Sequence, residues 1–228
     1  MRSVVCVKWG SKYPADYVNR LYNMVQRNLN LDHEFICLTD DSTDIDKKII
    51  IKPLTENLKY AYSKFELFVT DIQGEILFLD LDVVIIDSID DLFLYEPSAE
   101  FISIKDWDMD SINASCMRFN SKKFSFITYN WLNAVKSRFQ EEVFIDQATK
   151  EENLLYHDLV SFPPEVHRGD QEWTTNQLRE QNIPITYYPS DWLQSYKFGF
   201  DMNAKIIIFH GLPKPHQVKD KWVTMYWK

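Results

Sequence analysis

An apolar run that ends in two acidic residues constrains the fold more than any other feature of the sequence: Ile76-Leu77-Phe78-Leu79-Asp80-Leu81-Asp82-Val83-Val84. An unbroken apolar segment of this kind is typical of a strand that is covered on both faces of an α/β sheet. We therefore expect a central strand at Glu75–Asp82. Since alternate residues of an extended chain point to the same side, the carboxylates of Asp80 and Asp82 should face one way.

Two neighbouring carboxylates repel each other unless a cation lies between them or one is protonated. Mn²⁺ and Mg²⁺ take oxygen ligands, so the Asp80 and Asp82 pair predicts a site for either cation. The carboxyl end of a strand is also where open α/β sheets bind ligands. The alternative is that the pair caps a turn or the following helix, but unpaired charge after a buried run is costly, which favours the metal site.

The first 90 residues alternate short apolar segments with helical patterns, as βαβ architecture requires. We expect strands at Ser3–Lys8, Glu34–Thr39 and Lys48–Lys52, a helix opened by Pro14, and a helix near Asn57–Ile72. Further along, we expect strands at Glu100–Lys105, Ser111–Phe119, Ile185–Tyr188 and Lys205–Phe209, and helices near Lys122–Arg138, Asp170–Gln181 and Lys219–Trp227. The later strands should complete the same sheet. The polar segment Gln140–Arg168, with Pro163 and Pro164, has the least regular pattern.

Composition limits the class of protein. The chain has 228 residues, 45% of them hydrophobic, and a formal net charge of −9. This length favours one domain, and the acidic balance argues against nucleic-acid binding. The three cysteines are odd in number and form no CxxC pair, which indicates a reducing compartment. Because the sequence also has no apolar stretch of about 20 residues and no cleavable leader, we expect a cytoplasmic protein without a transmembrane segment.

His210 follows the expected strand Lys205–Phe209 and opens the segment His210-Gly211-Leu212-Pro213-Lys214-Pro215-His216. Imidazole is a common ligand for first-row metals, and the adjacent glycine allows close approach of a ligand to the backbone. Together with Asp80 and Asp82, His210 is the predicted third metal ligand. His216 and His167 have no such support and are expected to lie at the surface or on the acceptor side.

Seven short segments occur along the chain in a fixed order: Val7–Tyr13, Cys37–Asp41, Tyr62–Phe65, Leu79–Asp82, Asn113–Ser115, Gly169–Trp173 and Phe209–His216. This order resembles bacterial glycosyltransferases related to glycosyltransferase family eight. The resemblance covers almost the whole chain. The resemblance implies a GT-A fold, in which a Rossmann-like mixed sheet is flanked by helices in a single domain over residues 1–228. Residues 1–90 would bind the nucleotide, and residues 91–228 the donor sugar and the acceptor.

The resemblance also implies an activity, in which a sugar moves from a nucleotide-diphospho-sugar, expected to be a UDP-sugar, to a glycan or glycolipid acceptor. Transfer should depend on Mn²⁺ or Mg²⁺ and retain the anomeric configuration. Asp80 and Asp82 match the family's DxD motif, whose first carboxylate also meets the ribose, and His210 matches its third metal ligand. Lys64 matches a basic residue that contacts the donor, and Lys214 matches a lysine that closes on the diphosphate.

Further positions carry over from the family in the same way. Lys8 and Tyr13 fall in the loop that lines the nucleotide pocket, and Asp40 matches an acidic residue near the nucleobase or ribose. Asn113 and Ala114 match a pair beside the donor sugar.

Asp170 and Gln171 match the pair near the reacting face of the donor sugar and are the predicted catalytic residues. The chain departs from the family at two positions. Ser115 stands where glycine is usual, and the closing segment is shorter and ends in His216, where the family has tryptophan.

Ordinary structural roles compete with several of these assignments. Lys8, Lys12 and Lys64 could be solvated lysines, Asp40 a turn residue, and Asp170 the N-cap of the following helix.

Two aromatic features are equally open. Trp107 could stack on an acceptor sugar or pack in the core. The aromatic and basic segment Lys219–Lys228 could touch the inner face of a membrane, although its helical spacing favours a closing helix packed on the sheet.

Two other classes of protein remain as alternatives. The run Phe78–Val84 also resembles the motif of haloacid-dehalogenase-like phosphohydrolases, in which Asp80 would be the nucleophile, but that motif normally follows the first strand. A noncatalytic nucleotide- or glycan-binding module is the second alternative. A nucleotidyltransferase is disfavoured because no glycine-rich loop follows the first strand.

Overall fold

The computed structural model describes residues 1–56, 58–143 and 169–228, so most of the irregular polar segment, with Pro163, Pro164 and His167, lies outside the described residues. The strands are β1 (Arg2–Lys8), β2 (Glu34–Thr39), β3 (Ile50–Pro53), β4 (Glu75–Leu79), β5 (Val83–Ile85), β6 (Phe101–Lys105), β7 (Ile112–Asn120), β8 (Ile185–Tyr187), β9 (Leu193–Ser195) and β10 (Ile206–Ile208). The α-helices are α1 (Ala15–Asn28), α2 (Asp90–Leu94), α3 (Ser125–Val143), α4 (Asp170–Glu180) and α5 (Lys221–Tyr226), and the 3₁₀ helices are η1 (Tyr60–Phe68), η2 (Ser121–Lys123) and η5 (Pro215–Gln217).

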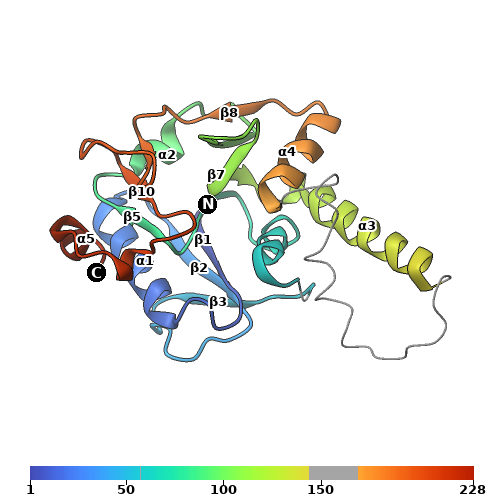
Figure 1. Cartoon of the computed structure of the whole chain (residues 1–228), viewed down its shortest axis with the longest axis horizontal. Coiled ribbons are helices and arrows are strands. Elements are labelled where there is room, and N and C mark those ends of the chain that lie inside the picture. The colour runs from blue at the N-terminus through green and yellow to red at the C-terminus, as the bar shows by residue number, and fades with distance from the viewer. Residues whose placement is uncertain (57, 144–168) are drawn as a thin grey trace.

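The main sheet has seven strands in the order β3-β2-β1-β4-β7-β6-β8. Strands β1 to β4 run parallel, and β7 runs antiparallel to both of its neighbours, β4 and β6. Helices lie on both sides of this mixed sheet (Figure 1). The predicted fold class is therefore confirmed: the chain is an α/β protein built on a mixed sheet flanked by helices.

A second, smaller sheet corrects one prediction. β10 pairs with β5 and β9 in a three-stranded sheet, so Lys205–Phe209 does not complete the main sheet. The reason lies at the end of β4. The chain turns at Leu81–Asp82, and the remainder of the apolar run becomes the separate strand β5. The acidic pair therefore lies in a turn between two sheets rather than within one strand.

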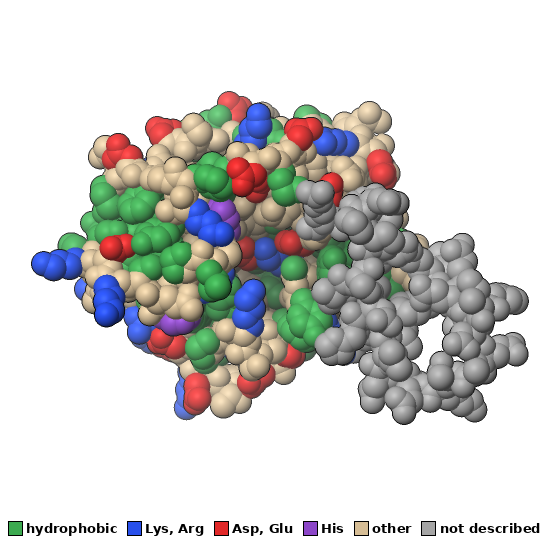
Figure 2. Space-filling view, in the orientation of Figure 1, with side chains coloured by type: hydrophobic (Ala, Val, Ile, Leu, Met, Phe, Trp, Pro, Cys, Tyr) green, Lys and Arg blue, Asp and Glu red, His purple; other side chains and the backbone are tan. Residues whose placement is uncertain are grey.

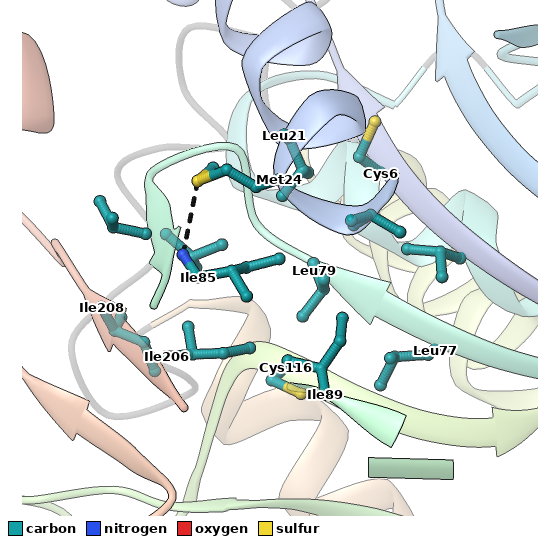
Figure 3. Close-up of a cluster of buried hydrophobic side chains, with 14 of the residues drawn as sticks. Cys6, Leu21, Met24, Leu77, Leu79, Ile85, Ile89, Cys116, Ile206 and Ile208 are labelled. Carbon is teal, nitrogen blue, oxygen red and sulfur yellow. Dashed lines mark hydrogen bonds between the residues drawn. The ribbon is translucent and has the colours of Figure 1, made fainter. Parts of the chain in front are cut away.

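One core cluster fills the space between the main sheet, α1 and the smaller sheet. Figure 3 shows Leu21 and Met24 of α1 directed toward Leu79, Ile85 and neighbouring side chains. These side chains are fully buried, and each fully buried side chain of this size contributes about 1.5–3 kcal/mol to folding. The helix fits this place because the apolar residues of its sequence recur at helical spacing. Its burial fixes the loop that precedes it at the end of β1.

A second core cluster lies on the other face of the main sheet, beneath η1, α3 and α4 (Figure 1). Its aromatic side chains come from all three helices, with Trp131 in edge contact with both Phe65 and Trp173. Each ring supplies a large apolar area, so three helices from distant parts of the sequence pack on one face. This packing places Lys64 and Asp170 at the same edge of the sheet.

The predicted helix near Asn57–Ile72 is shorter and of a different type than expected. It is a 3₁₀ helix over Tyr60–Phe68, and Tyr60 has a left-handed backbone with φ of 55°. A right-handed helix cannot continue back through such a residue. The preceding loop is held instead by the buried carboxylate of Glu66, which accepts hydrogen bonds from the backbone N–H groups of Thr55, Glu56 and Leu58.

The carboxyl-terminal segment packs against the smaller sheet as helix α5. Val223 and Trp227 are buried, and Trp222 packs against Phe209, whereas Met225 points outward and is 61% exposed. The closing-helix interpretation of this segment is therefore confirmed for Val223 and its aromatic neighbours, whereas Met225 faces solvent. In the described part of the chain, no helix has both the length and the apolar character needed to cross a bilayer.

Candidate active site

A pocket of about 640 Å³ lies at the carboxyl ends of β1 and β4, a volume typical of small-molecule sites. Figure 2 shows it as a hollow with acidic and basic side chains at its base. Its walls come from the loop after β1, the start of η1, the turn after β4 and the closing segment before η5. The residues lining it are Val7, Trp9, Gly10, Ser11, Lys12, Tyr13, Tyr60, Ala61, Ser63, Lys64, Asp80, Leu81, Asp82, Ser115, Gln171, His210, Gly211 and Lys214.

Lys64 joins two acidic residues in this pocket. Its Nζ lies 2.9 Å from Asp80 Oδ2 and 3.2 Å from Asp170 Oδ2. Burial alone would lower the pKa of Lys64, but the carboxylates of Asp170 and Asp80 outweigh it and the pKa is raised. Burial raises the pKa of the Asp80 carboxyl, against the opposing effect of Lys64. Lys64 therefore stays charged and links the end of β4 to the start of α4.

Asp82 is held by a second lysine and by a phenol. Tyr13 donates a hydrogen bond of 2.8 Å to Asp82 Oδ2, and the Lys214 ammonium contacts the same oxygen. Burial, reinforced by the Asp82 charge, raises the pKa of Tyr13, so its hydroxyl remains a donor. Lys214 Nζ also donates to the Phe209 carbonyl at 3.1 Å. Asp82 is 6% exposed and Lys214 9%, so this ion pair is largely shielded from water.

A backbone hydrogen bond ties the acidic turn to the segment that carries His210. Phe209 N donates to the Asp82 carbonyl at 3.1 Å. This bond extends the pairing of β5 with β10 by one step, which brings His210 to the pocket wall beside the acidic pair. The relative position of the two segments is therefore set by the main chain and not by the side chains that face the pocket.

The ring of His210 is fixed on several sides. Its Nε2 lies 2.6 Å from Ser195 Oγ, and Ser195 Oγ also accepts hydrogen bonds from the backbone N–H groups of Lys197 and Phe198. Trp107 stacks on the imidazole with the ring centroids 5.2 Å apart and the planes 8° from parallel. Burial, followed by the charge of Lys197, lowers the pKa of His210. The imidazole is therefore neutral at pH 7, which is the form that binds metals.

The three predicted metal ligands, Asp80, Asp82 and His210, line one pocket. In residues 1–56, 58–143 and 169–228, however, no three His, Cys, Asp or Glu side chains are close enough together to hold a metal ion. The ammonium groups of Lys64 and Lys214 lie on the two carboxylates instead. The donor set of two carboxylates and an imidazole fits Mn²⁺ or Mg²⁺ chemically, and Lys64 and Lys214 each occupy one oxygen of these carboxylates.

The residues predicted for the nucleotide and the donor sugar have different positions. Tyr13 lines the pocket together with Lys64, Asp80 and Lys214, whereas Lys8 and Asp40 do not. Lys8 Nζ is buried and donates to the Asp41 carbonyl at 3.2 Å. Asp40 accepts from Gly10 N at 3.0 Å, so both residues shape the loop after β1, where Gly10 has φ of 62°.

Asn113 and Ala114 also lie behind the pocket wall. Asn113 Nδ2 donates to Asp106 Oδ2 at 3.1 Å, and Ala114 N donates to Gln171 Oε1 at 3.0 Å. Gln171 lines the pocket, as does Ser115, whereas Asp170 reaches it through Lys64. These contacts connect β7 to α4 at the place where a donor sugar was predicted.

The sequence interpretation missed three residues that shape the site. Trp9 and Tyr60 line the pocket with their rings 4.7 Å apart, and an aromatic residue directly after the first strand was a signal for the first of them. Ser195 had no such signal, because it lies in the short strand β9, which the sequence pattern does not reveal.

The fold and site define a class of α/β protein with a pocket at the carboxyl ends of its parallel strands. The sequence matches no family model and no curated protein. Solved glycosyltransferases share its fold. The glycosyltransferase GlyE of Streptococcus pneumoniae TIGR4 is 13% identical, with a TM-score of 0.66 over 100% of this chain and 60% of that one. The chain thus spans less than two thirds of GlyE.

Two further structures cover their own chains more fully. The galactosyltransferase LgtC, solved with donor and acceptor sugar analogs, is 13% identical with a TM-score of 0.59, over 97% of this chain and 91% of that one. Mouse xyloside xylosyltransferase 1 is 12% identical with a TM-score of 0.56, over 93% of this chain and 100% of that one. At this level of identity the likeness establishes the fold alone, which is the fold of these glycosyltransferases.

Proposed function

We propose that the protein is a metal-dependent glycosyltransferase that moves a sugar from a UDP-sugar to a glycan or glycolipid acceptor with retention of configuration. One observation carries the proposal: two acidic residues after β4 and two lysines from distant segments converge in a single pocket. The shared fold with solved glycosyltransferases supports it.

The charges of the pocket suit a cation together with a diphosphate. Three carboxylates, those of Asp80, Asp82 and Asp170, meet two ammonium groups, those of Lys64 and Lys214, beside a neutral imidazole. Lys12 also lines the pocket, so the positive and negative charges balance. Entry of a divalent cation would make the sum positive, which favours a diphosphate. The two ligands would therefore support each other's binding.

Asp80, Asp82 and His210 would hold Mn²⁺ or Mg²⁺, which supplies Lewis-acid assistance to a departing diphosphate when bound. Lys64 remains beside Asp80 and places a positive charge where the leaving group gains negative charge. Lys214 moves from Asp82 to the diphosphate and adds a second positive charge. Removal of a single electrostatic contact of this kind typically costs about 10²–10³ in turnover.

The remaining pocket residues suit the rest of a donor. The rings of Trp9 and Tyr60 offer a face for a nucleobase, and Tyr13, which lines the same pocket, donates to Asp82. Asp170 and Gln171 lie at the start of α4, on the side of Asn113 and Ala114. We place the donor sugar and its reacting face there. Asp170 is fixed there by its ion pair with Lys64.

A thermal-shift panel of UDP, GDP, CDP and TDP with and without Mn²⁺ tests the proposal. A ligand at about 100 times its dissociation constant stabilises the native state by about 2.7 kcal/mol. We expect UDP with Mn²⁺ to give the largest rise in melting temperature, and UDP-sugar to be turned over slowly even without an acceptor. A panel in which no nucleotide stabilises the protein, with or without Mn²⁺, would contradict the proposal.

The same assays separate the two alternatives. Stabilisation by a fluoroberyllate, with no response to nucleotides, would support a phosphohydrolase with Asp80 as nucleophile. Binding of UDP without any turnover would support a noncatalytic module.

We further propose that the protein is cytoplasmic, because its cysteine usage indicates a reducing compartment. Peripheral contact with the inner face of the membrane would then give it access to a glycolipid acceptor.

A further inference from the structure

We propose that Phe198 and Trp107 form a stacking platform for a pyranose ring of the acceptor, next to the pocket wall formed by His210. This inference rests on the proposed glycosyltransferase function and deepens it, because it assigns the acceptor a place and a chemical class. Neither aromatic residue lines the pocket itself.

Three flat rings from three separate segments gather at this place. Phe198, from the loop between β9 and β10, lies 5.7 Å from His210 with the ring planes 23° apart. Trp107, from the connection between β6 and β7, lies 6.4 Å from Phe198 with the planes 30° apart. The planes of all three rings are close to parallel, and Phe198 is the more exposed of the two platform rings, because Trp107 stacks on His210 and packs against the core.

Phe198 is exposed in a way that folding does not explain. Its residue surface is 53% accessible to solvent, although a buried phenylalanine contributes about 1.5–3 kcal/mol. A pyranose has a face of axial C–H groups with partial positive charge, which complements the negative face of an aromatic ring. Stacking of such a sugar covers the exposed ring and leaves the hydroxyl groups of the sugar free to point outward.

The platform has a polar border that suits hydroxyl groups. Figure 2 shows a histidine at the edge of the hollow with basic, acidic and hydrophobic side chains around it. Lys197 Nζ lies over Gly211, only 2.7 Å from where a β-carbon of that residue would be. Both Lys197 and Asp106 are close enough to influence the charge of His210. An ammonium donor and a carboxylate acceptor therefore flank the rings.

The platform is also fixed relative to the proposed donor-sugar position. The Asp106 carboxylate accepts hydrogen bonds from the backbone N–H groups of Asp108 and Met109, which holds the loop that carries Trp107. Its other oxygen accepts from Asn113 Nδ2 at 3.1 Å. One carboxylate thus connects the stacking rings to the segment that we place beside the donor sugar.

The test compares Phe198→Ala with Phe198→Tyr, which keeps the ring, and with Met225→Ala, which removes an exposed apolar side chain elsewhere. Each protein is saturated with UDP and Mn²⁺ and probed by saturation-transfer NMR with methyl β-galactoside, methyl β-glucoside and methyl N-acetyl-β-glucosaminide. We expect at least one glycoside to bind the wild type through its axial C–H protons. Phe198→Ala should weaken that binding about 10-fold, while Phe198→Tyr and Met225→Ala should leave it within about 2-fold.

Failure of this inference is distinguishable from failure of the proposed function. Unchanged glycoside binding in Phe198→Ala, or no glycoside signal on a wild type that UDP and Mn²⁺ still stabilise, would overturn the platform alone. Loss of sedimentation with anionic lipid vesicles in Phe198→Ala, with glycoside binding unchanged, would assign Phe198 to a membrane surface instead. A wild type that UDP and Mn²⁺ do not stabilise would overturn the proposed function and the platform with it.

Discussion

Ser195 Oγ lies 2.6 Å from His210 Nε2, and it also accepts hydrogen bonds from two backbone N–H groups, at Lys197 and Phe198. A neutral imidazole that binds a cation through one ring nitrogen donates a hydrogen bond from the other, so for His210 to bind through Nδ1, its Nε2–H donates to Ser195 Oγ. A fully buried serine then fixes the orientation and the tautomer of the proposed metal-binding imidazole.

We predict that Ser195→Ala weakens Mn²⁺ binding without removing it. Loss of a residue that orients a metal-binding histidine typically costs about 10–100-fold in metal affinity. The measurement is a titration of Mn²⁺ in the presence of UDP, followed by thermal shift.

Ser111→Ala is the matched control for this prediction. Ser111 is also buried, and its hydroxyl has no hydrogen-bond partner in the described part of the chain. An equal loss of Mn²⁺ affinity in Ser111→Ala and Ser195→Ala would show that the effect is general and not specific to the histidine.

The buried Asp82–Lys214 pair leads to a second prediction. Lys214→Met leaves the Asp82 carboxylate without its ammonium partner, and breaking a buried pair in this way typically destabilises by about 3–5 kcal/mol. The hydrogen bond from Tyr13 offsets part of that cost. Urea unfolding of the ligand-free protein measures the loss, and the double variant Asp82→Asn, Lys214→Met should recover most of it.

Activity should not follow stability in these variants. Asp82→Ala and the double variant should both lose turnover of a UDP-sugar, because each lacks a proposed metal ligand. Near-normal transfer by Asp82→Ala would rule out the proposed metal site.

Glu66 gives a prediction about stability alone. Its buried carboxylate accepts backbone hydrogen bonds from the loop before η1, including those of Glu56 at 3.1 Å and Leu58 at 3.3 Å. Glu66→Ala should leave these donors unsatisfied and lower the free energy of unfolding by about 2–3 kcal/mol. Glu100→Ala, at an exposed ion pair with Lys123, should change it by less than about 1 kcal/mol.

The pH dependence of stability should report the environment of His210. Burial lowers the pKa of this residue in the folded state, so between the lowered pKa and about 6.5 the unfolded chain binds more protons than the native protein. The free energy of unfolding therefore falls as the pH is lowered through about 6.5. His210→Asn should flatten this dependence in urea unfolding from about pH 7.5 to about 5.5. An identical slope in both proteins would contradict it.

The regular half of the fold was predictable because its patterns are long. β2 has the predicted bounds Glu34–Thr39, and α1 follows Pro14 as expected, since six or more residues with a clear period identify an element. The strands β5 and β9 were not predicted, because β5 continues the apolar run of β4 without a break and β9, Leu193–Ser195, has a mixed composition. The prediction also placed β10 in the wrong sheet, because its pairing with β5 depends on the turn after β4.

The predicted site residues converge to different degrees, for physical reasons. Asp80 and Asp82 reach the pocket because they follow β4 of the main sheet, whereas His210 reaches it because β10 of the smaller sheet pairs with β5. The ion pairs of Lys64 and Lys214 were not predictable, because they depend on how α4 and the closing segment pack. Lys8 turns away from the pocket because its buried ammonium donates to the carbonyl groups of Gly10 and Asp41, in the loops after β1 and β2.

The hydrogen bond from Phe209 N to the Asp82 carbonyl has a consequence for redesign. Because main-chain atoms hold the acidic turn against the histidine segment, replacing the side chains at positions 82 and 210 leaves that bond intact. The side chains at these two positions can therefore be exchanged while the backbone contact between the two segments is kept. Histidines or cysteines at positions 82 and 210 would change which cation the proposed metal site prefers.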